Sequence, residues 1–145
     1  MIDYKSDLTI RKPVEKAFSF IQEVSRYDEW TDMTGTRLLS GEGLRLGSQI
    51  ETTMKIGPSK RTMVFEVVAF EPNRRIGWKT VTKGPLHWDA EFLFEPVDES
   101  SAHVTSSGVI QLNGALKLME GIMAGEVRTG EAKELERFKS LVEAV

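Results

Sequence analysis

One glutamate in an apolar stretch is the residue of this chain best suited, by its type and surroundings, to act as an acid or a base. Glu66 lies within residues 60–70, which fit a long strand that is apolar in both alternating phases. If Val64, Val68 and Phe70 face the interior, Glu66 faces it too. A carboxyl group in an apolar cavity has a raised pKa, and it can exchange a proton with a ligand or bind a ligand hydroxyl.

The opposite register of the same strand gives Glu66 an ordinary role. If Met63, Phe65 and Val67 face inward, the carboxylate points to solvent. A shift of one residue reverses every side chain of a strand, and the sequence leaves both registers open. Glu66 is therefore a candidate for catalysis only in the first register, and no other catalytic residue is predicted.

A set of aromatic and methionine side chains is suited to binding an apolar ligand. Tryptophan offers a broad contact surface and one hydrogen-bond donor, and methionine adapts to irregular shapes. The same side chains also serve as plain core packing, and the sequence does not decide between the two interpretations. The predicted cavity lining consists of Trp30, Met54, Trp78, Trp88, Phe92, Met119 and Met123.

Other reactive groups give little support for catalysis or metal binding. His87 and His103 alternate with apolar neighbours and are predicted to lie on the surface, without a chelating partner at a suitable spacing. The chain has no cysteine, which excludes disulfides, thiol catalysis and cysteine-based zinc sites. No serine lies in a nucleophile elbow, and the glycines at 41 and 43 lack the lysine of a phosphate-binding loop. We predict no metal and no cofactor.

Composition is that of an ordinary soluble protein. The chain has 145 residues, of which 40% are hydrophobic and 28% charged, and its net charge is −3. This length fits one domain, residues 1–145. The negative charge and the lack of a basic stripe argue against nucleic-acid binding. No apolar run approaches the length of a membrane span and the chain does not open on a signal sequence, so a cytoplasmic location is expected.

Alternating apolar residues and regular turn signals predict a largely antiparallel sheet. Turns are expected at residues 57–59, 71–73, 84–85 and 96–101, and they separate about six strands after a short opening. Consecutive strands joined by short turns pair antiparallel. Two short helices are expected after the first strand, the first of them beginning at Pro13, where a missing N–H costs nothing. The class is α+β.

The final stretch, residues 114–145, is predicted to be a helix interrupted near Gly121, Gly125 or Gly130. Its apolar residues recur at spacings of three and four, so one face must cover the sheet. They are Leu116, Met119, Met123, Val127, Leu135, Phe138, Leu141 and Val142. We expect the sheet to wrap this helix and to leave a pocket between them, with its mouth at the first half of the helix.

Leu118 and Ile122 fall on the opposite side of the same helix. Apolar residues there indicate cover by a loop, a lid or a partner protein, or else two exposed side chains, which are common. The sequence leaves these alternatives open. Oligomeric state, monomer or homodimer, is equally open.

The whole pattern resembles the helix-grip superfamily of START domains, birch-pollen-type allergens and, most closely, bacterial polyketide cyclase/dehydrase-like proteins. Four stretches carry the resemblance: residues 10–21 followed by Trp30, residues 41–48, residues 70–76 and residues 134–143. The resemblance implies a seven-stranded antiparallel sheet curled round the terminal helix, with an apolar cavity between them. It transfers no catalytic residue, because the superfamily has no shared catalytic motif.

Three functions remain as hypotheses. The first is binding, and possible transport or conversion, of a hydrophobic small molecule such as a lipid, an isoprenoid or a polyketide. The second is a cyclase or dehydratase without metal or nucleotide cofactor, using Glu66 with cavity hydroxyls such as Thr52 or Thr80. The third is a module that binds a protein partner through Leu118 and Ile122.

Overall fold

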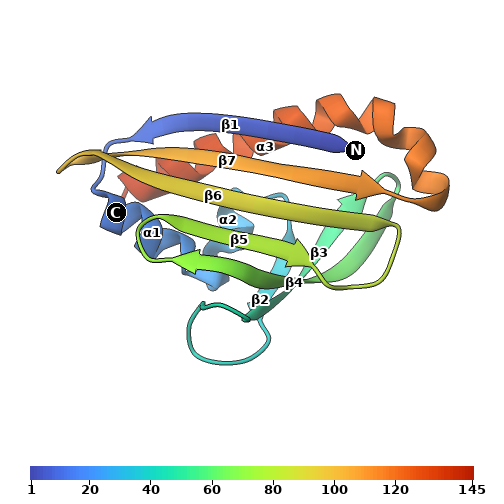
Figure 1. The fold of residues 1–145 in the computed structure, drawn as a ribbon, viewed down its shortest axis with the longest axis horizontal. Helices are drawn as coiled ribbons and strands as arrows, with labels where there is room; N and C mark the ends of the chain where they lie inside the picture. Colours follow the sequence, from blue (N-terminus) through green and yellow to red (C-terminus); the bar gives the residue numbers. More distant parts are fainter.

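A seven-stranded antiparallel sheet curls around one long helix in the computed structural model, which describes residues 1–145 (Figure 1). The strand order is β1-β7-β6-β5-β4-β3-β2. The strands are β1 (Ile2–Ile10), β2 (Thr34–Leu38), β3 (Gln49–Ile56), β4 (Ser59–Glu71), β5 (Arg75–Thr80), β6 (Leu86–Asp98) and β7 (Ser101–Leu112). The helices are α1 (Val14–Ile21), η1 (Val24–Arg26), α2 (Tyr27–Trp30), η2 (Gly114–Met119) and α3 (Glu120–Glu143). The predicted α+β class and the seven-stranded helix-grip architecture are confirmed.

Helices α1 and α2 carry the chain from one edge of the sheet, β1, to the other edge, β2. Pro13 precedes the first turn of α1, and its carbonyl oxygen accepts hydrogen bonds from the N–H groups of Lys16 and Ala17 at 2.9 and 3.3 Å. Helix α1 buries Phe18 and Ile21 against the sheet. Because the connection passes under the curled sheet, it closes one end of the space that α3 fills.

Helix α3 crosses the concave side of the sheet, and its two halves differ in burial. Leu135, Phe138 and Val142 in the second half are fully buried, and the Phe138 ring packs edge-on against Trp30 at a centroid distance of 5.1 Å. No side chain of the first half is fully buried. The exposure pattern agrees with the expectation that an opening lies at the first half of the helix.

The predicted interruption of this helix at a glycine is wrong. Helix α3 runs unbroken through Gly121, Gly125 and Gly130, and the change of geometry occurs where η2 passes into α3 after Met119. A glycine inside a helix costs about 1 kcal/mol relative to alanine, which lowers stability without breaking the hydrogen-bond ladder. Packing of the second half against the sheet outweighs that cost, because tertiary contacts decide most helix boundaries.

A β-bulge in β4 explains why this strand is apolar in both phases. Met63, Phe65 and Val67 are buried against the interior. The pairing with β5 shifts between Val67 and Ala69, so that Phe70 also turns inward, onto Phe18 at a centroid distance of 5.5 Å. The bulge adds one residue and reverses the phase of everything beyond it.

The inward orientation considered for Glu66 is therefore wrong. Glu66 precedes the bulge and shares the outward phase of Val64. Its carboxylate accepts a hydrogen bond from the side-chain amide of Gln49 at 3.3 Å, on the outer face of the sheet. Because Glu66 does not face the interior, it cannot act in a cavity as an acid or a base.

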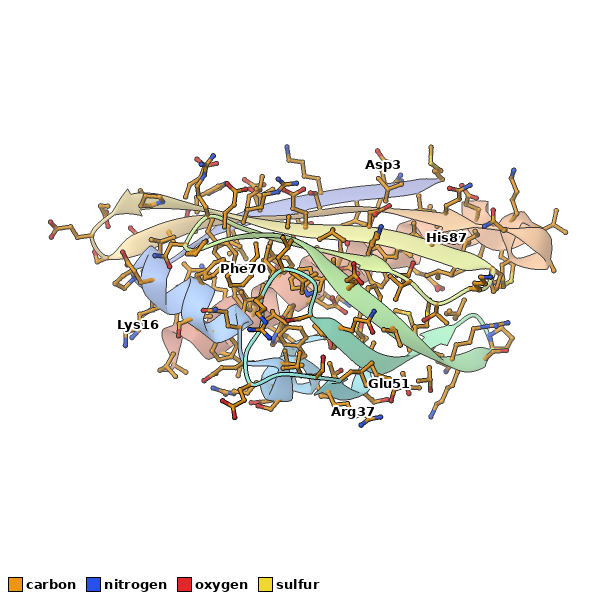
Figure 2. The ribbon with its side chains drawn as sticks, turned by 60° about the horizontal axis from the view of Figure 1, so that its bottom comes forward. Asp3, Lys16, Arg37, Glu51, Phe70 and His87 are labelled. Carbon is orange, nitrogen blue, oxygen red and sulfur yellow. The ribbon has the colours of Figure 1, made fainter.

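Polar side chains cover the outer face of the sheet, and aromatic side chains fill the space between sheet and helices (Figure 2). Asp3 and His87 lie on the outer face, whereas Phe70 lies inside. The His103 Nε2 atom is 3.0 Å from the carboxylate of Asp7, also on the outer face. No helix of the protein has both the length and the hydropathy needed to cross a bilayer.

Candidate functional site

A small cavity lies between the concave side of the sheet and α3. Its volume is about 60 Å³. Trp30, Trp78, Trp88 and Phe92 line it, together with Phe65 and ten other residues. A cavity of this size holds a few water molecules or one small polar group, well below the ~300–1,000 Å³ of a pocket for a whole organic ligand.

A groove of about 650 Å³ adjoins this cavity. The turn between β3 and β4, at Gly57 and Pro58, forms one side of the groove, and the first half of α3 forms the other. Met33, Trp88, Glu131 and Glu134 line both the groove and the cavity. The two spaces are therefore contiguous. Of the two, only the groove has the volume of an ordinary ligand site.

The structure brings all seven predicted lining residues to this connected space. The four aromatic residues, Trp30, Trp78, Trp88 and Phe92, border the cavity. The three methionines, Met54, Met119 and Met123, border the groove. Their contact with a ligand remains a prediction. The division by residue type is informative, because rigid rings enclose the inner space and flexible thioethers enclose the outer one.

Edge-to-face aromatic packing fixes the shape of the inner wall. The ring centroid of Phe92 lies 5.6 Å from that of Trp30 and 6.0 Å from that of Trp78, with interplanar angles of 61° and 88°. Tyr27 packs against both tryptophans, and its hydroxyl donates a hydrogen bond to the carbonyl oxygen of Ile21 at 2.6 Å. The wall is therefore held from several directions, and it is preorganised rather than adaptable.

Two indole N–H groups in this wall have no hydrogen-bond partner. The Nε1 atoms of Trp30 and Trp78 are buried and unpaired, although the two side chains are only 4% and 7% exposed. The third indole differs, because Trp88 Nε1 donates to the Tyr4 hydroxyl at 3.0 Å. A buried donor without an acceptor costs about 1–3 kcal/mol, so two in one cavity wall call for a functional explanation.

The Tyr4 hydroxyl reaches this wall because the facing residue is a glycine. Tyr4 on β1 pairs with Gly108 on β7, and a Cβ atom at position 108 would overlap the tyrosine oxygen. Burial raises the pKa of the Tyr4 hydroxyl, and the nearby charge of Glu131 raises it further. The hydroxyl therefore stays protonated and can donate its own hydrogen while it accepts one from Trp88.

Two carboxyl groups from α3 also border the cavity. Glu131 is half-buried, and Glu134 is only 8% exposed. Glu134 Oε1 accepts a hydrogen bond from the backbone N–H of Asp32 at 2.9 Å, which fastens the loop after α2 to the helix. Arg137 binds the same loop through the Trp30 carbonyl oxygen, at 3.0 Å.

Burial raises the pKa of both carboxyl groups. For Glu131 the second cause is the neighbouring Glu134, and Asp32 adds to the shift. The pKa of Glu134 is raised by burial, although the Asp32 N–H and the Glu131 side chain, which hydrogen-bond it, oppose the shift. Arg137 opposes the rise in both groups. Both carboxyl groups therefore keep a proton to higher pH than an exposed glutamate does, and two such groups side by side are suited to donate and accept a proton.

The sequence contains a signal for this pair, although the pair was not among the predicted catalytic residues. Met123, Val127, Glu131, Glu134 and Phe138 follow each other at spacings of four, four, three and four. This spacing keeps all five on one helix face, so two carboxyl groups lie on the apolar line. Buried carboxylates are rare unless they are paired or functional, which makes their position on that line the informative feature.

The hydroxyl groups predicted to assist catalysis are divided between two places. Thr52 lines the cavity, where its hydroxyl is 2.8 Å from that of Thr36. Thr80 does not border the cavity, and its hydroxyl accepts the backbone N–H of Trp88 at 3.0 Å. Glu66, His87 and His103 are all outside the cavity and the groove.

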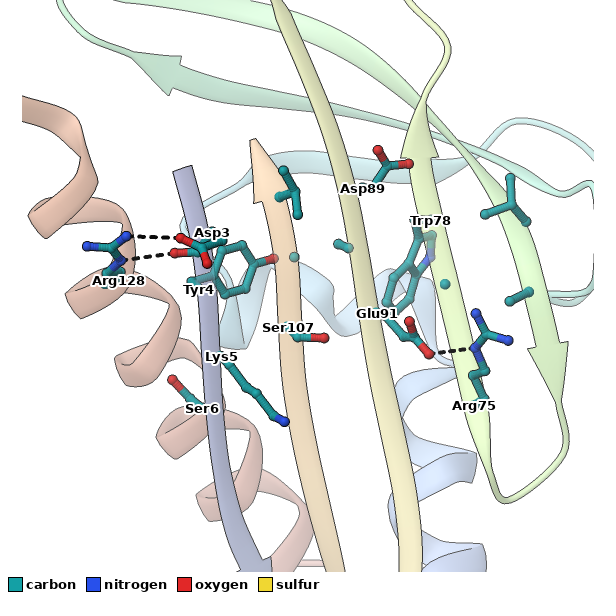
Figure 3. A pocket seen from close by; sticks show the side chains of 16 residues that line it. Asp3, Tyr4, Lys5, Ser6, Arg75, Trp78, Asp89, Glu91, Ser107 and Arg128 are labelled. Carbon is teal, nitrogen blue, oxygen red and sulfur yellow. Dashed lines mark hydrogen bonds and ion pairs between the residues drawn. The ribbon is translucent and has the colours of Figure 1, made fainter. Parts of the chain in front are cut away.

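A second, larger hollow on the outer face of the sheet lacks the features of a binding site (Figure 3). Its volume is about 750 Å³, and it is open to solvent. Four of its charged side chains pair with each other: Arg128 lies 3.1 Å from Asp3, and Arg75 lies 2.5 Å from Glu91. Exposed ion pairs of this kind contribute little to stability, and an open, solvated surface gives a ligand little burial.

A curled sheet that grips a long helix over an internal space defines the helix-grip class. The chain belongs to the family described as "Polyketide cyclase / dehydrase and lipid transport", whose model matches residues 1–143. A search of curated proteins finds no significant sequence match.

Solved structures with low sequence identity share the fold over nearly the whole chain. The protein TTHA0849 from Thermus thermophilus is 13% identical with a TM-score of 0.81, covering 98% of this chain and 97% of its own. A START superfamily protein from Mycobacterium smegmatis is 17% identical with a TM-score of 0.77, covering 97% and 99%. The Zhui aromatase/cyclase from Streptomyces sp. R1128 is 13% identical with a TM-score of 0.74, covering 97% and 93%.

Proposed function

We propose that this protein binds a hydrophobic small molecule in the connected space between the sheet and α3. The observation that carries the proposal is the groove of about 650 Å³ leading to a wall of three tryptophans. These three are all the tryptophans of the chain. Family membership supports the same function, because the family description includes lipid transport and cyclase chemistry.

The groove has the properties that an apolar ligand requires. Met54, Met119 and Met123 form an adaptable wall, and Met119 lies across the opening, 3.4 Å from where a Cβ on Gly57 would stand. Burial of apolar surface stabilises such a complex by about 25 cal/mol per Å² before the cost of association is subtracted. The ligand class is a lipid, an isoprenoid or a polyketide-like molecule.

Titration with the fluorescent probe N-phenylnaphthylamine tests this function. We expect saturable binding at one site, accompanied by a change in tryptophan fluorescence. Met123→Lys places a charge in the groove and should weaken binding at least about tenfold, because an ammonium group is strongly hydrated. Leu118→Lys is the matched control, since Leu118 is 88% exposed and lies outside the groove.

Equal weakening by the two variants would contradict the proposal. Weakening by Leu118→Lys alone would favour an interaction through the exposed pair Leu118 and Ile122, which are 88% and 75% exposed. Those two side chains are the surface that the partner-binding hypothesis requires, and no other feature of the structure supports that hypothesis.

The carboxyl pair supports a second candidate function, acid–base conversion of the bound molecule. In such a step the Glu134 carboxylate takes a proton from the carbon beside a carbonyl group, and the Glu131 carboxylic acid protonates the carbonyl oxygen. The product is the enol, and the reverse transfers restore the ketone. Cyclases and dehydratases need a step of this kind, and the cavity excludes the bulk water that would compete with it.

Deuterium exchange into a probe ketone tests the second function. Incubation of methyl octyl ketone with the protein in D₂O should replace hydrogen by deuterium beside the carbonyl faster than buffer alone does. Glu134→Gln should abolish the acceleration, because an amide does not accept the proton. Glu66→Gln, on the outer face, is the matched control and should leave it unchanged. Exchange at the buffer rate with the unaltered protein would refute catalysis and leave binding intact.

A further inference from the structure

We propose that the end of the molecule where the groove opens docks on an anionic lipid bilayer. Three segments form this docking end: the β3–β4 hairpin at residues 52–65, the β5–β6 loop at residues 80–88, and residues 110–119 at the end of β7 and in η2. The bilayer is both the surface that is bound and the source of the apolar molecule. The inference rests on the proposed function only for this purpose, because docking itself is measured without a ligand.

Contacts between the three segments make them one continuous surface. The Met119 side chain lies 3.4 Å from where a Cβ on Gly57 would stand, so η2 packs against the β3–β4 hairpin. The backbone N–H of Asn113 donates to the Pro85 carbonyl oxygen at 2.8 Å, which joins the start of η2 to the β5–β6 loop. Figure 1 shows the three segments at the end of the sheet where α3 begins. Each of them also contributes lining residues to the groove.

The docking end carries positive charge and no carboxylate. Its basic residues are Lys55, Lys60, Arg61, Lys83 and Lys117. The rest of the chain holds all 22 acidic residues and the other 14 of the 19 basic ones. These five cations are exposed and none forms an ion pair, whereas six arginines elsewhere in the protein do. A protein of net charge −3 therefore presents one positive end.

Two of these lysines lie directly opposite each other in the sheet. Lys55 on β3 pairs in register with Lys60 on β4. Like charges that face each other across an antiparallel pair are destabilising. The nearest carboxylate that follows the docking end in sequence, Glu120, is bound by the N-terminal amine of Met1 and does not relieve the repulsion. An anionic surface relieves it.

Two apolar side chains project beside these cations. Leu118 is 88% exposed, and Ile122, one helical turn further on, is 75% exposed. Apart from Met1, no large apolar side chain of the protein is more exposed than these two. Ile122 also lines the groove, so the pair lies at the rim of the opening. Peripheral proteins bind a bilayer by this combination, in which apolar groups enter the acyl boundary while lysines bind anionic headgroups.

Other partners fit this combination less well. In a symmetric dimer through this end, the same cations would face each other with no carboxylate between them. A nucleic acid would bind the cations and leave Leu118 and Ile122 in water. An acidic protein would need a pocket shaped for the two side chains, whereas a bilayer accepts them without one. A bilayer also lies against the opening of the groove, so an apolar molecule passes into the protein without crossing water.

Co-sedimentation with sucrose-loaded vesicles tests the docking. One set of vesicles is an equimolar mixture of phosphatidylglycerol and phosphatidylcholine, and the other is phosphatidylcholine alone. We expect the protein to bind the anionic vesicles at least about tenfold more tightly than the neutral ones. Raising the salt concentration from about 0.05 M to about 0.5 M should remove most of this difference, because salt screens exposed charges.

Lysine variants show which end of the molecule binds. The double variant Lys60→Gln, Lys117→Gln should weaken binding to anionic vesicles about tenfold or more, since each lysine near an anionic surface contributes about fivefold. The matched control is Lys16→Gln, Lys139→Gln, which removes the same charge from α1 and the last part of α3, at the opposite end of the molecule (Figures 1 and 2). It should change binding less than about twofold, because distant charges are screened.

Leucine variants measure the apolar contribution. Leu118→Asn should weaken binding about tenfold, because the burial of a leucine side chain is lost. Leu46→Asn is the matched control, since Leu46 is 65% exposed in the loop between β2 and β3, and it should leave vesicle binding unchanged. All these variants should keep the affinity for N-phenylnaphthylamine, measured without vesicles, because none of the changed residues lines the groove or the cavity. Retained affinity shows that the variants are folded.

Each other outcome overturns a distinct statement. Equal binding to anionic and neutral vesicles, or equal weakening by the two lysine double variants, overturns the recognition of anionic lipid by this end. No association with anionic vesicles, while N-phenylnaphthylamine still binds, overturns the docking in favour of an acidic protein partner and leaves the proposed function standing. Vesicle binding by a protein that does not bind the probe overturns the proposed function and leaves the docking standing.

Discussion

At the scale of single residues, the cavity wall combines polar groups that a simple core would not retain. Two tryptophans have indole donors without acceptors, and two carboxyl groups with raised pKa values line the same cavity. Replacing such groups by apolar residues of similar size is often neutral or stabilising. Their presence on a wall that is largely hydrophobic indicates that the protein gives up stability for recognition.

Glu131→Gln should make the protein more stable at alkaline pH. The Glu131 carboxyl has a pKa raised above its ordinary value of 4.5 by burial and by Glu134. The folded state therefore holds a proton that the unfolded state has lost, and stability falls as pH rises from about 4.5 through the raised pKa. Glutamine does not ionise, so the variant escapes this loss.

Thermal unfolding at about pH 5 and about pH 9 measures this effect. At each pH the difference in melting temperature, variant minus unaltered protein, is taken. This difference should be larger at about pH 9 than at about pH 5 by roughly 2–8 °C, given about 2–4 °C per kcal/mol for a domain of this size. Glu136→Gln, at an exposed position of the same helix, should show no such change. A pH-independent difference would mean that Glu131 titrates normally.

Gly108→Ala should destabilise the protein and disconnect Tyr4 from Trp88. The new methyl group would overlap the Tyr4 oxygen and lie 2.7 Å from the Asp89 carbonyl oxygen, so one of them must move. Overpacking of this kind costs about 1–3 kcal/mol. Urea unfolding measures the cost. Unchanged stability would show that the Tyr4 side chain or the neighbouring strand moves aside without loss of free energy of unfolding.

At the scale of elements, α3 combines a clamp and a border in one helix. Its second half is anchored by Phe138, and its first half, which borders the groove, contains three glycines and Met123 between positions 120 and 130. Glycines lower the stability of that half relative to alanine. Opening of a groove requires a segment that moves at low cost in free energy. The glycines of the first half of α3 give it this property.

Gly125→Ala tests how much stability the first half gives up. A Cβ atom at this position meets nothing within 4 Å, and the backbone is helical. Alanine should therefore stabilise the protein by about 1 kcal/mol, measured by urea unfolding. It should also slow ligand entry if opening of this half admits the ligand. Destabilisation would show that the helix is not regular in solution.

The elements show which features could be predicted from the sequence. Alternation and turn residues predicted the strands, because a one-sided sheet imposes a period of two on its side chains. The direction of Glu66 could not be predicted, because the bulge at Val67 and Ala69 changes the phase within β4, and the resulting pattern, apolar in both phases, does not show on which side of the bulge Glu66 lies. The sequence also did not predict that α3 runs unbroken through its glycines. Glycine has a low helix propensity, and here tertiary packing overrides it.

At the scale of the whole molecule, residues distant in sequence converge on one space. Trp30 comes from the connection between the sheet edges, Trp78 and Trp88 from central strands, and Glu131 and Glu134 from the terminal helix. The aromatic lining was predictable because tryptophans are few and alternate in phase. The carboxyl pair was missed because the terminal helix carries many charged residues, and only the spacing from the apolar line separates Glu131 and Glu134 from the solvated ones. The fold itself was predictable from the resemblance.

The most direct measurement of the central claim is the indole region of a ¹⁵N–¹H NMR spectrum during titration with methyl octyl ketone. The chain has three tryptophans, and all three line the cavity. The account predicts saturable shifts of the indole N–H signals. If the ketone binds while all three signals stay still, the ligand does not occupy this space and the account is wrong.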